Sequence, residues 1–109
     1  MADTYKYVQG DTGPQIKVTI TSADGTATDL TGGSVTLHFR AAGETTVLFS
    51  RVLVNSNQTT DTGKTVLQFQ DGDLNVDAGN YEGELETILT GLRETRYELL
   101  KFKIREDFA

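Results

Sequence analysis

The sequence predicts an all-β domain, a sandwich of about seven antiparallel strands, on three observations. Apolar residues alternate with polar residues at a period of two along most of the chain, a pattern that indicates strands with one face on a core and one in water. Short turn signals that contain Gly separate the alternating segments. The composition, with 11 Gly, 1 Pro and abundant Thr and Val, is typical of strands and turns rather than helices.

The first four strands are expected at residues 4–9, 15–22, 34–41 and 46–55. Three of them alternate clearly, and the residues expected to face inward are Tyr5 and Tyr7, then Ile16, Val18 and Ile20, then Val35, Leu37 and Phe39. The fourth segment is apolar at more consecutive positions, so its inward face remains open. The turn signals that divide these strands are Asp24-Gly25, Gly32-Gly33 and Ala42-Gly43.

The last three strands are expected at residues 65–70, 80–90 and 94–105. The residues expected on one face of each are Leu67 and Phe69, then Tyr81, Gly83, Leu85, Thr87 and Leu89, then Leu100, Phe102 and Ile104. Thr62-Gly63 and Thr90-Gly91 are the turn signals in this half of the chain. Residues 55–64 are polar throughout and are expected to be a mobile loop, while residues 71–80 form a second loop that leads into the sixth strand.

All 109 residues, 1–109, are expected to form one domain, because a chain of this length can bury one independent core. The absence of Cys excludes a disulfide, a thiolate metal site and a thiol nucleophile. A net charge of −6 argues against a nucleic-acid partner, which favours a basic protein face. No apolar run reaches the length of a membrane span, about 18 residues, and the N-terminal segment lacks the pattern of a signal peptide.

The segment Asp77-Ala78-Gly79-Asn80-Tyr81 carries the most information about the type of sandwich. Immunoglobulin-like domains have an Asp-x-Gly/Ala-x-Tyr stretch at the start of the sixth strand, where the Tyr hydroxyl bonds back to the backbone and fixes the corner between the sheets. We therefore predict an immunoglobulin-like antiparallel β-sandwich with Asp77, Gly79 and Tyr81 as its structural corner. The Cys of the usual disulfide would fall at Gly83, so the chain would be a cysteine-free relative. The alternative is an ordinary turn before a strand.

Two candidate sites for phosphate binding and catalysis have simpler structural interpretations. Gly63-Lys64-Thr65 resembles half of a phosphate-binding loop, but without a strand-to-helix context it is expected to be a turn that opens the fifth strand. His38 is the only histidine and is expected to be exposed on a strand. No oriented nucleophile can be recognised beside it.

Two groups of carboxylates also have both a functional and a structural interpretation. Asp71, Asp73 and Asp77 could surround a Ca²⁺ ion, although Asp residues also cap turns for local reasons. Glu82, Glu84 and Glu86 lie about 7 Å apart on one strand face, a separation that a glycosidase could use. Solvated charges at a sheet edge are the expected interpretation, with contact to a basic partner as the alternative. The chain is therefore expected not to be an enzyme and to bind no cofactor or metal.

Several segments together resemble a known family. They are, in chain order, Gln9-Gly10-Asp11-Thr12, Ile16-Lys17-Val18-Thr19, Ala23-Asp24-Gly25-Thr26, Asp29-Leu30-Thr31-Gly32, Val35, Phe39-Arg40 and residues 78–86. In order and spacing they resemble the N-terminal immunoglobulin-like domain of the phage baseplate upper protein family, over roughly residues 5–105. The resemblance implies a virion component that anchors to the tail or baseplate. In that family a following helical and C-terminal region carries the receptor-binding protein, and these 109 residues contain no counterpart of it.

The expected function is that of a non-enzymatic virion structural module, a tail or baseplate component assembled in the host cytoplasm. Its partners would be other virion structural proteins, or further copies of itself in a ring. The residues expected at the interface are the aromatic and basic ones of the two end strands, namely Tyr5, Tyr7, Arg96, Tyr97, Lys101, Lys103 and Phe108.

Alternatives to this function remain open. The chain could be a capsid-decorating or neck protein of the virion. It could also be a carbohydrate-binding sandwich for adhesion to the host surface, with Tyr5, Tyr7, Tyr97 and Phe108 as an exposed aromatic platform. In a third interpretation the aromatic residues only close the sandwich, and the basic residues are solvated.

Overall fold

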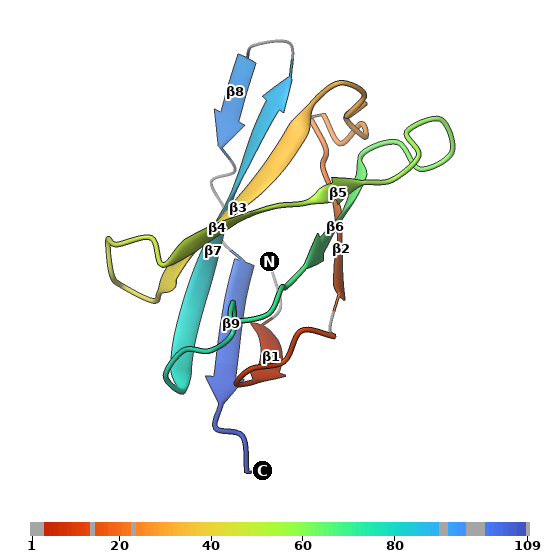
Figure 1. Ribbon diagram of the computed structural model, residues 1–109. Helices are drawn as coiled ribbons and strands as arrows, with labels where there is room; N and C mark the ends of the chain where they lie inside the picture. The colour runs from red at the N-terminus through yellow and green to blue at the C-terminus, as the bar shows by residue number, and fades with distance from the viewer. Residues whose placement is uncertain (1–3, 14, 23, 90–91, 96–99, 109) are drawn as a thin grey trace.

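The computed structural model describes residues 4–13, 15–22, 24–89, 92–95 and 100–108 (Figure 1). The larger sheet has six strands, and in it β1 (Thr4–Val8), β9 (Leu100–Arg105), β7 (Gly79–Leu89), β3 (Ser34–Ala41) and β4 (Phe49–Val52) follow one another, while β8 (Leu92–Thr95) pairs with β7. The smaller sheet contains β2 (Gln15–Thr19), β6 (Lys64–Gln68) and β5 (Val54–Asn55) in that order. No helix in the described part of the chain is long and apolar enough to cross a membrane.

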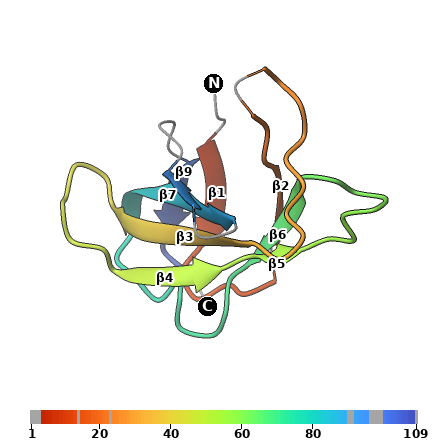
Figure 2. The same cartoon turned by 90° about the horizontal axis from the view of Figure 1, so that it is seen from above.

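The prediction of an all-β sandwich is confirmed. Figure 2 shows β2 and β6 on one side of the molecule and β9, β7 and β3 on the other. The order β9-β7-β3-β4 corresponds to the G-F-C-C′ sheet of an immunoglobulin-like sandwich, and β2-β6-β5 corresponds to its B-E-D strands. In the larger sheet the first strand, β1, and the last strand, β9, are neighbours.

The first strand departs from the predicted antiparallel arrangement. It pairs in parallel with β9, with Tyr5 opposite Phe102 and Tyr7 opposite Ile104. The other pairings of the described strands are antiparallel. Burial explains the position of β1, because the Tyr5 ring packs against Phe102 with 5.7 Å between centroids. The larger sheet is therefore mixed.

The described residues form nine strands rather than seven, because two predicted strands are each divided. Segment 46–55 divides at Leu53, which is buried and whose amide donates to the Val35 carbonyl at 2.8 Å. Before Leu53 the chain pairs with β3, and after it the chain pairs with β6, so this segment passes from one sheet to the other. Segment 94–105 divides into β8 and β9, and residues 96–99 lie outside the described residues.

The core is built around aromatic rings from several strands. Phe39 stacks on Phe49 with 4.7 Å between centroids, and it lies 5.2 Å from both Tyr81 and Phe102. The predicted inward residues Ile16, Ile20, Val35, Leu37 and Phe39 are all buried, whereas Val18 is only half-buried. Each fully buried side chain of this size contributes roughly 1.5–3 kcal/mol through the hydrophobic effect.

Gly83 lies where the expected fold usually has a disulfide. A Cβ at this position would lie 2.4 Å from Cδ1 of Leu37 and 3.1 Å from Cε2 of Phe102. Both neighbours are fully buried. Leu37 and Phe102 therefore fill the space that a disulfide would occupy, and the core is stabilised by packing instead of a covalent bridge.

Candidate functional site

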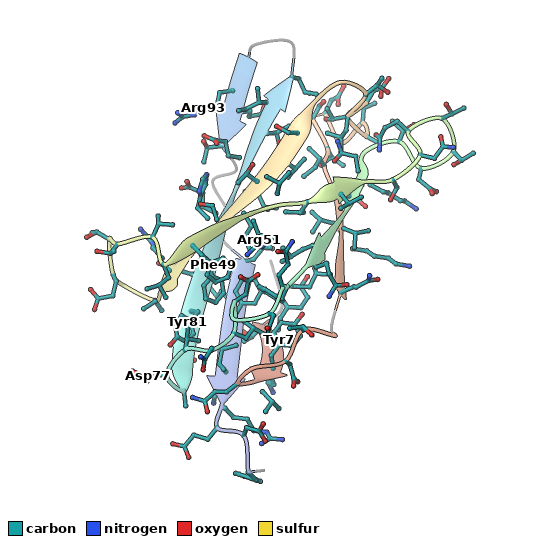
Figure 3. The ribbon with its side chains drawn as sticks, viewed as in Figure 1. Tyr7, Phe49, Arg51, Asp77, Tyr81 and Arg93 are labelled. Atoms are coloured by element: carbon teal, nitrogen blue, oxygen red, sulfur yellow. The ribbon has the colours of Figure 1, made fainter. Side chains whose placement is uncertain are left out.

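The tyrosine corner has the hydrogen bond expected from its sequence. The Tyr81 hydroxyl donates to the Asp77 carbonyl at 2.5 Å, and Figure 3 shows both residues at one end of β7. Desolvation raises the pKa of Tyr81, and the nearby Asp77 carboxylate raises it further. Gly79, between them, has a φ of 156°, a backbone conformation that residues with a side chain rarely adopt. This group fixes the entry of the chain into β7 and so stabilises the fold.

A buried ion pair was missed by the sequence analysis. Asp73 accepts hydrogen bonds from Nε and Nη2 of Arg51 at 2.9 and 2.5 Å, and one from the Gln70 amide at 2.8 Å. The carboxylate proposed as part of a cation site is thus occupied by a guanidinium. Among the residues that the structure describes, no three His, Cys, Asp or Glu side chains are grouped so as to hold a metal ion.

The predicted edge position of Glu82, Glu84 and Glu86 is wrong, because β7 lies inside the larger sheet between β9 and β3. Glu82 accepts from Nε of Arg40 at 2.8 Å. Glu86 pairs with Nε of Arg93 at 2.9 Å and lies 3.4 Å from Nε2 of His38. Glu82 and Glu86 are therefore part of a ladder of charges across the outer face of the sheet.

His38 is also less exposed than predicted. Its Nδ1 lies 2.7 Å from the Ser50 hydroxyl, and its other ring nitrogen faces Glu86. Both partners come from neighbouring strands, since β3 lies between β4 and β7. The histidine is held between a serine and a carboxylate on an open sheet face. Ser50 and Glu86 are cross-strand neighbours of His38, and the hollow that His38 lines with Arg40, Val47 and Glu84 holds only about 40 Å³.

The polar loop 55–64, which we expected to be mobile, is joined to its surroundings by hydrogen bonds of the Gln58 side chain. The Gln58 carbonyl oxygen Oε1 accepts from the amides of Leu30 and Gly63 at 3.0 and 2.8 Å. Its Nε2 donates to the carbonyls of Ser56 and Lys64. The predicted turn at Gly63 is confirmed, because β6 begins at Lys64. One polar side chain therefore connects this loop to the loop before β3.

The aromatic residues of the first strand close the sandwich. Tyr7 packs edge to face on Phe69 and also lies beside Phe102, with centroid distances of 5.7 and 6.3 Å. Burial, with a smaller effect of Tyr5, raises the pKa of Tyr7 to about 12. Phe108, in contrast, is almost fully exposed, with the Arg105 guanidinium 4.8 Å from its centroid. The predicted interface residues Arg96 and Tyr97 lie outside the described residues.

Four cations lie together on the outer face of β1 and β9, and we call them the basic edge. They are Lys6, Lys101, Lys103 and Arg105, all of them exposed. Lys6 lies directly opposite Lys103 in the strand register. The carboxylates of Glu82, Glu86 and Asp73 pair with cations outside the basic edge. Lys6, Tyr7, Val8, Lys103 and Arg105 line a surface hollow of about 300 Å³ at this edge.

The opposite border of the larger sheet is aliphatic. Val47, Leu48, Val52 and Val54 are 48–69% exposed along the segment that forms β4 and β5. The neighbouring Arg51 turns inward to Asp73, so its charge does not interrupt this row. The larger sheet thus has exposed cations on β1 and β9 at one border, and exposed aliphatic side chains in β4 and the residues just before it at the other.

The chain matches no model of a known protein family and no curated protein sequence. The immunoglobulin-like architecture hosts many unrelated functions, so the fold by itself assigns none. The surfaces that can be interpreted for function are the two borders of the larger sheet.

Proposed function

We propose that the chain is a non-enzymatic structural module of a phage virion, which joins a neighbouring protein through the basic edge. The basic edge carries this proposal. It gathers four of the 10 Lys and Arg residues of a chain whose net charge is −6. Lys6 and Lys103 repel each other as cross-strand neighbours, which makes the arrangement unfavourable for the isolated domain. An acidic partner that covers the edge would turn this repulsion into attraction.

The location in the virion rests on the sequence resemblance to baseplate proteins. A tail or baseplate position is the proposal, and a neck or capsid position would use the same edge. The carbohydrate-binding alternative has less support, because Tyr5 and Tyr7 pack inward. Phe108 is the single exposed aromatic side chain among the described residues, and one ring does not make a platform.

The test is incorporation into particles. A tagged copy is supplied during infection by the phage whose genome carries the chain, and particles are purified by density gradient. The proposal expects the tagged chain in the particle fraction, and expects the double variant Lys6→Glu/Lys103→Glu to be lost from it. Lys17→Glu/Lys64→Glu is the matched control, because both side chains are exposed on the smaller sheet and the charge change is the same. Absence of the unmodified chain from particles would contradict the proposal.

A further inference from the structure

We infer that the border strand β1 binds an acidic, extended segment of the neighbouring protein as an additional strand of the larger sheet. This inference rests on the proposed function for the existence of a neighbour. It goes further by naming the chemistry of the partner segment and the way it is held. Three features carry it: unpaired backbone groups along β1, the hollow beside them, and the charge of the surrounding side chains.

The backbone of β1 has a free side. The Gln9 amide donates to the Arg105 carbonyl at 3.0 Å, which shows that Gln9 directs its backbone toward β9. Successive residues of a strand direct their N–H and C=O groups to opposite sides, so Tyr5 and Tyr7 face β9 while Lys6 faces away. Within the described residues, β1 ends the order of strands in its sheet. The N–H and C=O of Lys6 are therefore available to another strand.

The end of this free side is defined by a loop. The Gly10 amide donates to the Leu74 carbonyl at 3.0 Å, so the loop before β7 covers the border beyond β1. The Asp11 amide also donates to the Val8 carbonyl at 3.2 Å, so an added strand would lie along Thr4 to Tyr7 and stop at Val8. This length admits a segment of about four or five residues, which is a common strand length.

The hollow at the basic edge sets the side chains that such a segment would carry. Tyr7 and Val8 contribute apolar wall, and the charged groups around the hollow are Lys6, Lys103 and Arg105. Residues two apart on a strand lie about 7 Å apart on the same face. A segment with carboxylates at alternate positions would place one beside Lys6 and the next ones level with Lys101 and Arg105, which lie one strand further in, opposite Thr4 and Val8. The complementary partner is therefore a strand of the type Glu-x-Glu or Asp-x-Glu, with apolar residues between the acids.

The same charges exclude other occupants of this border. Pairing of β1 with β1 of a second copy would bring two Lys6 side chains close together, and their charges would repel each other. Charged side chains on border strands are a common means by which proteins prevent such self-pairing. A nucleic-acid duplex would have to cross the neighbouring β7, where Glu82 lies opposite Lys101 and Glu84 is exposed. Phosphates would be repelled there, whereas a single peptide strand along β1 stays clear of these carboxylates.

The experiment measures binding of short capped peptides to the purified chain by calorimetry and by amide chemical shifts. The acidic probe has the sequence Thr-Glu-Val-Glu-Val-Asp-Thr. A probe with Lys at the acidic positions tests charge, and the acidic probe with N-methylated amides at alternate positions tests the backbone. We expect the acidic probe alone to bind, with shifts centred on Thr4, Lys6, Val8 and Lys103. We expect binding to weaken at least about tenfold when salt is raised to several hundred millimolar.

Variants locate the surface. Lys6→Glu/Lys103→Glu should abolish binding of the acidic probe, and Lys17→Glu/Lys64→Glu should leave it within about twofold. Both pairs of side chains are exposed, so both variants should keep the melting temperature and the circular dichroism spectrum of the parent chain. If Lys6→Glu/Lys103→Glu loses the fold, the single variant Lys6→Gln, with an expected loss of severalfold in affinity, replaces it.

Three results would overturn the inference. Equal binding of the methylated and unmethylated acidic probes would show a charged patch without strand addition. Tighter binding of a short DNA duplex than of the acidic probe would assign the edge to nucleic acid. If the acidic probe does not bind at millimolar concentration, β1 does not accept acidic extended segments. In each case incorporation into particles is measured separately, so the proposed function can stand while the strand-addition inference fails.

Discussion

The buried ion pair between Arg51 and Asp73 is expected to stabilise the fold far more than the surface pair between Arg93 and Glu86. The pairs have similar separations, 2.5 Å for Nη2–Oδ1 and 2.9 Å for Nε–Oε2. They differ in burial, because the side chain of Arg51 is 25% exposed and that of Asp73 is 7% exposed, whereas that of Arg93 is 70% exposed. Figure 3 shows Arg51 near the middle of the molecule and Arg93 near its end.

The magnitude follows from this difference in burial. Removing one partner of a fully buried pair costs about 3–5 kcal/mol, and access of water to part of Arg51 lowers the expected cost of Asp73→Asn to about 2 kcal/mol. The side-chain amide that this substitution introduces keeps an oxygen for the N–H of Gln70, so the change mainly removes the charge. For Glu86→Gln we expect a cost of about 0.5 kcal/mol from the loss of the pair with Arg93, since exposed pairs are screened by water.

The assay is urea unfolding of two double-mutant cycles. One combines Asp73→Asn with Arg51→Met, which keeps an unbranched side chain but removes the guanidinium that lies 5.9 Å from the Phe49 centroid, and the other combines Glu86→Gln with Arg93→Met. The expected coupling energies are about 1–2 kcal/mol for the first cycle and about 0.5 kcal/mol or less for the second. A coupling energy between Arg51 and Asp73 no larger than that between Arg93 and Glu86 would refute the reasoning, because burial would then not control the strength of these ion pairs.

Three further predictions concern the core and the corner. Tyr81→Phe keeps the ring and removes the hydrogen bond to Asp77, so the free energy of unfolding should fall by about 1 kcal/mol; an unchanged urea midpoint would count against the bond. Gly83→Ala should cost about 1–3 kcal/mol by overpacking against Leu37, and Leu37→Val in the same chain should recover part of it, whereas an additive loss would contradict the proposed contact. Tyr7 ionises near 10.0 when unfolded but near 12 when folded, so stability should be complete below pH 10 and decline as the pH rises toward 12. The decline should be smaller in Tyr7→Phe when urea midpoints are compared across that range, and an identical decline would assign it to other groups.

The fold class could be predicted because alternation is a local signal. In β3 the alternate residues Val35, Leu37 and Phe39 are buried, as the period of two requires. Strand partners are not a local property, which explains the two errors in the topology. Nothing near Leu53 shows that the chain changes sheets there, and nothing near Tyr5 shows that the first strand joins the last one.

The functional surfaces could be predicted only in part for the same reason. The charge of the last strand is enough to indicate Lys101 and Lys103 as interface candidates. It does not indicate Lys6, because Lys6 joins them only through the parallel pairing of β1 with β9. Arg51 lies in segment 46–55, where the sequence pattern does not show which residues face inward. Its contact with Asp73 therefore could not be deduced from periodicity. The Tyr81 corner was predictable because donor and acceptor are four residues apart in a fixed motif.

Site-specific photo-crosslinking in assembled particles tests the central claim most directly, that the chain is held in the virion by its basic edge. A photoreactive residue replaces Thr4 in one sample and Thr19 in another, because both threonines are exposed but lie on different sheets and neither belongs to the basic edge. We predict that position 4 crosslinks to an acidic segment of another virion protein and that position 19 does not. Crosslinks from position 19 with none from position 4, or the absence of the chain from particles, would contradict the claim.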